Sequence, residues 1–106
     1  MARNVAHREI TRLHIVLQAE ALNHTHPAYD YFLRREAMVL DEFTRMFEPL
    51  FEDSDTLARQ MLALMDGLAQ QWLRVDGAFD LIDIWDRTVS TILRKVSHKA
   101  KKESLV

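Results

Sequence analysis

The stretch LMDGLAQQWL, residues 64–73, decides the fold because its apolar residues keep a helical spacing on both sides of Gly67. A glycine inside a helix costs about 1 kcal/mol relative to alanine. At about 100° per residue, the apolar side chains around this stretch cover half of the helix circumference. The other half is polar, and Ala63 and Gly67 lie at its centre. We therefore predict that one face of this helix enters the core, and that the other has room for a close neighbour.

The composition predicts one all-α domain. The chain has 106 residues, of which 48% are hydrophobic and 28% are charged, a length suited to a single core. Its two glycines and two prolines are too few for the turns of a many-stranded sheet, while helix-forming residues abound.

The charge and the cysteine count exclude several function classes. A formal net charge of −2 gives no broad basic field for nucleic acid. The absence of cysteine excludes disulfides and thiolate metal sites. No apolar run approaches the roughly 20 residues of a membrane span, and the first residues lack the apolar segment of a signal peptide. We expect a cytoplasmic protein with no membrane partner.

Four amphipathic segments are expected to form antiparallel-type helices. They cover residues 4–22, 27–47 or 27–51, 54–74, and 81 onward, within a domain of residues 1–98 followed by a basic flexible tail of residues 99–106. Pro27 suits a first helical turn, and Pro49 ends or bends the second helix. Asp53 or Ser54 and Asp80 are the expected N-caps of the last two helices.

The last two helices carry the predicted dimer interface. In the fourth helix an apolar stripe needs burial, which a small chain supplies most easily at an interface. In the third helix, Ala63 and Gly67 either face water, which a single glycine tolerates, or touch a second subunit. For a closed two-fold homodimer the predicted interface residues are Ala63, Gly67, Gln70, Gln71, Leu81, Trp85, Val89, Ile92 and Val96.

Glu36 is the polar residue of greatest interest. It falls within the apolar stripe of the second helix, where a carboxylate costs several kcal/mol unless it is paired or neutralised. Its partner is either an intradomain arginine or His14, or a ligand group or cavity water.

The chain resembles the C-terminal regulatory domain of TetR-family transcriptional repressors over nearly all of residues 1–98. Three elements carry the resemblance: the His26-Pro27-Ala28 opening of a long helix, residues 64–73, and the turn of residues 75–81 into the final helix. The resemblance implies a homodimer in which the last two helices form an intermolecular four-helix bundle. It also implies a cavity for a small hydrophobic or amphipathic ligand, with His14, Leu17, Phe32, Glu36, Val39, Phe43, Met61, Met65 and Trp72 as its expected lining.

Family members bind DNA through an N-terminal helix-turn-helix domain, for which residues 1–22 are far too few. We therefore expect contact with DNA only through a domain missing from this sequence, and the chain is either a piece of a longer protein or a free-standing regulatory domain. The alternative to ligand sensing is a helical interaction module without a small molecule. Packed aromatic and methionine side chains at helical spacing are also typical of a plain core.

No enzyme, cofactor or metal site is predicted. The serines lack a nucleophile-elbow context, and neither glycine lies in a phosphate-binding loop. His24 and His26 lie in a turn without a fixed carboxylate, and His7 and His14 are too far apart along a helix to share a metal easily. We interpret these histidines as loop or cap residues.

Overall fold

The structure is all-helical, as the composition predicts. It is a computed structural model that describes the backbone of residues 2–104 and the side chains of residues 7–94. Within those residues there is no strand, and the helices are α1 (Ala2–Glu20), α2 (Tyr29–Phe47), α3 (Ser54–Arg74) and α4 (Leu81–Ser104). The α4 backbone continues through residues 99–104, which the sequence assigns to a basic tail, and residues 105 and 106 lie outside the described residues.

Local hydrogen bonds and prolines mark the helix ends. Oδ1 of Asp80 accepts the amide hydrogen of Asp83 over 3.1 Å, which confirms the predicted cap of α4. Before α2, Nδ1 of His26 accepts the amide hydrogen of Ala28 over 3.0 Å, so this histidine is a loop residue that stabilises the turn leading into the helix. α2 ends two residues before Pro49, as expected from a ring that cannot continue a helix.

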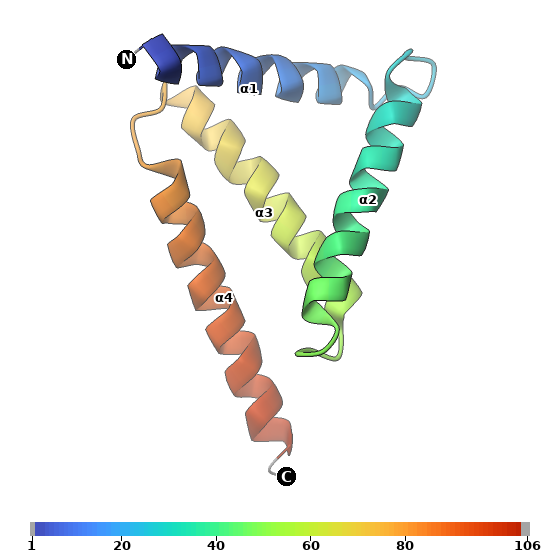
Figure 1. Cartoon of the computed structure of the whole chain (residues 1–106), viewed down its shortest axis with the longest axis vertical. Helices are drawn as coiled ribbons and strands as arrows, with labels where there is room; N and C mark the ends of the chain where they lie inside the picture. The colour runs from blue at the N-terminus through green and yellow to red at the C-terminus, as the bar shows by residue number, and fades with distance from the viewer. Residues whose placement is uncertain (1, 105–106) are drawn as a thin grey trace.

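The hydrophobic core lies where the C-terminal half of α2 packs against the N-terminal half of α3 (Figure 1). Its buried members are Phe47, Leu57, Ala58 and Met61. Around them pack the half-buried side chains of Leu40, Phe43, Phe51, Leu64, Trp85, Val89, Ile92 and Leu93. The core therefore joins α2, α3 and one face of α4, whereas α1 crosses the opposite end of α3.

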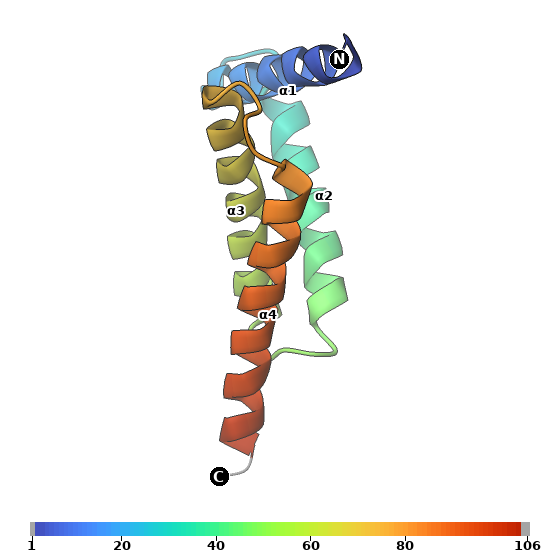
Figure 2. The same cartoon turned by 90° about the vertical axis from the view of Figure 1, so that its left-hand side faces the viewer.

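The helices form a flat and open layer. The molecule measures 51 × 36 × 17 Å, and its narrow profile is visible in Figure 2. Its accessible surface is 8349 Å², against roughly 6,100 Å² for a compact monomer of this mass. Helices of a stable domain bury an apolar stripe against another layer, and this chain supplies little of that second layer itself.

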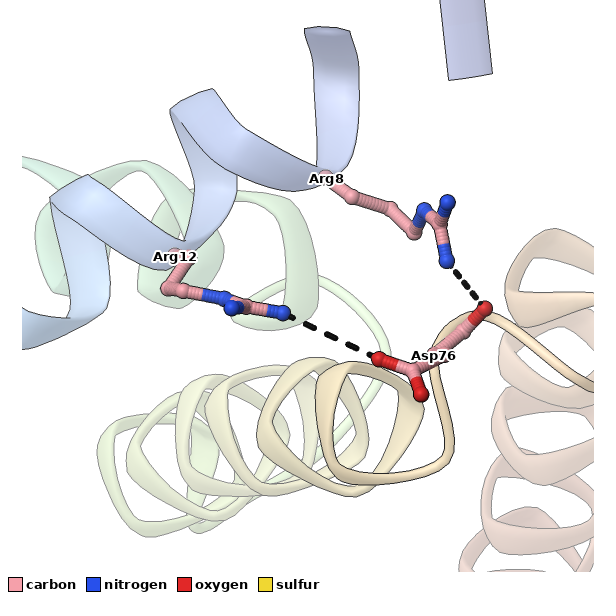
Figure 3. A network of polar contacts seen from close by, with 3 residues as sticks. All are labelled: Arg8, Arg12 and Asp76. Atoms are coloured by element: carbon pink, nitrogen blue, oxygen red, sulfur yellow. Dashed lines mark hydrogen bonds and ion pairs between the residues drawn. The ribbon is translucent and has the colours of Figure 1, made fainter. Parts of the chain in front are cut away.

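Two arginines of α1 hold the turn between α3 and α4 (Figure 3). The Arg8 guanidinium donates to the main-chain carbonyl of Asp76, and Arg12 Nη2 lies 3.9 Å from Asp76 Oδ1. The turn needs two left-handed residues, Asp76 at φ 54° and Gly77 at φ 74°. A Cβ at Gly77 would lie 3.1 Å from Cδ of Arg8 and 3.3 Å from the ring of Trp72. Gly77 is thus the glycine on which the chain's own packing depends.

Gly67 has no such constraint. A Cβ built at this position meets no atom within 4 Å beyond its own helix and its chain neighbours. The helix tolerates a glycine here, but nothing in the described part of the chain requires one. The space beside Gly67 is therefore open to water or to another subunit, and both alternatives raised by the sequence remain.

Candidate functional site

The residues predicted to line a ligand cavity are spread along the molecule. His14 and Phe32 meet where α1 approaches α2, with ring centroids 5.5 Å apart. Phe43 and Met61 belong to the core at the other end of α2, and Trp72 packs beside the Gly77 turn. The remaining members are the exposed Leu17, Glu36 and Met65 and the half-buried Val39.

The fold brings five polar side chains together where α1, α2 and α3 approach one another. This site, here called the polar junction, consists of His14, Arg35, Glu36, Arg59 and Asp66. Nη1 of Arg35 lies 3.0 Å from Nε2 and 3.2 Å from Nδ1 of His14. Nη1 of Arg59 lies 3.7 Å from Oε1 of Glu36, and both side chains are largely exposed. Glu36 therefore has an intradomain arginine as its partner, the first of the two possibilities raised by the sequence.

The junction shifts two pKa values in opposite directions. Burial, followed by the nearby Arg35 cation, lowers the pKa of His14. Burial, followed by the Glu36 carboxylate, raises the pKa of Asp66. Since arginine only donates hydrogen bonds, the His14 nitrogen facing it must be an unprotonated acceptor. The neutral imidazole is thus the form that fits this site.

Acidification is expected to weaken the junction through His14. The pKa of His14 is lower in the folded chain than in the unfolded chain, so the unfolded chain binds the proton more tightly. The free energy of unfolding therefore falls as the pH drops through the unfolded pKa of about 6.5. We expect the wild type to lose more stability than His14→Gln between about pH 7.5 and about pH 5.5. Urea unfolding at both pH values measures this difference, because the two proteins differ in sequence only at residue 14. Equal losses would show that His14 titrates as it does in the unfolded chain.

A second feature is a groove between α2 and α3, here called the α2–α3 groove. Its volume is about 340 Å³, and it is lined by Leu40, Thr44, Asp55, Thr56, Arg59, Gln60 and Ala63. Ala63 is one of the predicted dimer residues, so the groove opens beside the polar face of α3 rather than among the predicted cavity residues.

The predicted dimer residues divide into two sets. On α3, Ala63, Gln70 and Gln71 are exposed and Gly67 is half-buried. On α4, Trp85, Val89 and Ile92 already pack against the chain's own core, and Leu81 is half-buried. The side chain of Val96 lies outside the described residues. Within the residues whose side chains are described, the α3 set is therefore the more exposed of the two.

Sequence reasoning did not select Arg35, Arg59 or Asp66 as site residues. The available signal was spacing: Arg59 and Asp66 are seven residues apart, which places them on one side of α3. Their partners on α1 and α2 became evident only from the crossing of the helices.

Neither a metal site nor a membrane span is found in the described part of the chain. No three His, Asp or Glu side chains there lie close enough together to hold a metal ion. No described helix is long and apolar enough to span a membrane.

Comparison of the chain with models of known protein families, with curated protein sequences and with solved structures gave no match.

Proposed function

We propose that this chain is the dimerising regulatory domain of a TetR-like transcriptional regulator. The observation that carries the proposal is the excess accessible surface of the flat helical layer, about 2,200 Å² more than a compact monomer of this mass exposes. Obligate dimers bury about 1,000–2,500 Å² on each subunit. An area of this size is what a second copy of the chain would cover, which supports the proposed dimer.

The rest of the proposal follows from the family resemblance. A ligand would act by favouring one arrangement of the two subunits, and a DNA-binding domain outside this sequence would respond to that arrangement. Such a regulator is not an enzyme and works in the cytoplasm.

A helical interaction module without a small-molecule ligand is the second candidate function. The observation in its favour is the Glu36–Arg59 ion pair. Glu36 needs no ligand to offset its charge when an arginine of α3 lies 3.7 Å away. The two functions differ in the partner of the open surface, which is a second copy of the chain in the first and a different protein in the second, and in whether the polar junction receives a ligand.

The dimer is tested by molar mass in solution. Light scattering after size exclusion at micromolar concentration should give twice the chain mass of 12.4 kDa. Gly67→Leu should raise the dimer dissociation constant at least about tenfold, because a bulky side chain then occupies the close-approach face. Ala19→Leu, on the exposed surface of α1, is the matched control and should leave the constant unchanged. A monomeric wild type would overturn the proposal.

A further inference from the structure

The α2–α3 groove and the exposed face of α3 form one continuous surface. Ala63 belongs to both, and Gln60 lies one turn before it. At about 100° per residue, six residues of α3 fall within an arc of about 80°. These residues, here called the α3 stripe, are Thr56, Gln60, Ala63, Gly67, Gln70 and Arg74.

The order of residue types along the α3 stripe is similar from either end of the helix. If two α3 helices lie antiparallel about an axis near Met65, Ala63 faces the partner's Gly67 and Gln60 faces the partner's Gln70. Small residues then meet at the centre, where the backbones come closest, and amide side chains, which both donate and accept hydrogen bonds, meet on either side. A two-fold axis requires such self-complementarity of a single surface.

The charges at the two ends of the stripe complement each other in the same arrangement. Asp55 lines the α2–α3 groove in the first turn of α3, and Arg74 stands in the last turn. Antiparallel pairing brings the partner's Arg74 over Thr56, next to Asp55. Arg74 makes no ion pair within the described residues, so its guanidinium is available to a second subunit.

We propose that the occupant of the α2–α3 groove is Arg74 of a second copy of this chain, with the two α3 helices antiparallel and Ala63 against the partner's Gly67. This inference rests on the proposed dimer and names its interface and register. It places the symmetric contact on α3, whereas the apolar side of α4 serves the core of its own chain. Each dimer then contains two Asp55–Arg74 ion pairs across the interface.

Charge exchange between subunits tests the ion pairs. Asp55→Arg and Arg74→Asp should each raise the dimer dissociation constant about tenfold, because each homodimer places like charges opposite each other. A mixture of the two variants should form heterodimers of near wild-type affinity, since both pairs are then attractive. Circular dichroism of each variant alone checks that the helices are retained. An intrachain role for these residues cannot be rescued by mixing, so failure of the mixture to associate overturns the proposal.

Cysteine pairing tests the register, because the natural chain contains no cysteine. A mixture of Ala63→Cys and Gly67→Cys should form an intersubunit disulfide under mild oxidation, since the two Cα atoms would lie within about 7 Å. Ala63→Cys alone should form at least about tenfold less, because equivalent residues are offset by about 6 Å along the helices. A wild-type dimer with no preference for the mixed pair would overturn the register and leave the dimer intact. A wild-type monomer would instead overturn the proposed function.

Discussion

Phe47→Ala is expected to lower the free energy of unfolding by about 3–5 kcal/mol, the largest effect of any single substitution considered. Phe47 is 5% exposed and belongs to the same core cluster as the buried residues Leu57, Ala58 and Met61. Removing its ring leaves a cavity at the point where α2, α3 and α4 meet. Because single domains are stable by only about 5–15 kcal/mol, much of the population should unfold at moderate urea concentration.

The control for Phe47→Ala is its chain neighbour. The Met46 side chain is 61% exposed on the same helix, so Met46→Ala should change the free energy of unfolding by less than about 0.5 kcal/mol. Urea unfolding followed by circular dichroism, repeated at two protein concentrations, separates the core contribution from that of association. Equal effects of the two substitutions would place the core elsewhere.

The two glycines are expected to respond with opposite signs. Gly77→Ala should lower the free energy of unfolding by about 1–3 kcal/mol, because an alanine at φ 74° is strained and its Cβ presses on Arg8 and Trp72. Gly67→Ala should raise the free energy of unfolding of the monomer by up to about 1 kcal/mol, because alanine is the better helix former and the space around Cβ is open.

Thermal unfolding of both glycine variants below the dimer dissociation constant measures these changes. For Gly77→Ala, the change in tryptophan fluorescence relative to the wild type is a second readout, since the new methyl group would displace the ring of Trp72 and not that of Trp85. A stabilising Gly77→Ala would mean that the turn does not hold the left-handed conformation. A destabilising Gly67→Ala would mean that the chain itself encloses this position.

The order and approximate bounds of the helices could be predicted from sequence features that span only a few residues. Asp80 was predicted as a cap from its type and position, and it binds the Asp83 amide. The predicted helix over residues 54–74 matches α3. Both depend on hydrogen bonds or periodicity within a few residues, and such features are present in the sequence wherever the rest of the chain lies.

The candidate site was less predictable because it depends on how helices cross. Glu36 was expected inside the apolar stripe of its helix, but its side chain is 48% exposed, so its charge does not require a partner. Its pairing with Arg59 depends on the approach of α2 to α3. Trp85 and Val89 were predicted for an interface between subunits; within the chain they are partly buried against its own core, and their interface role stays a prediction. An apolar stripe shows which side of a helix must be buried and does not say which element covers it.

The sequence by itself determined four helices, the Asp80 cap of α4 and the residues that share each helical face, because these follow from local hydrogen bonding and from a rise and rotation repeated at every residue. The predicted cap of α3 at Asp53 or Ser54 makes no side-chain hydrogen bond. The tertiary structure decided which faces meet within the chain. It placed Gly77 between Arg8 and Trp72, where the chain requires a glycine, and it left Gly67 beside open space. The difference has one physical cause: helix crossing is set by contacts between residues distant in sequence, and no local repeat encodes those contacts.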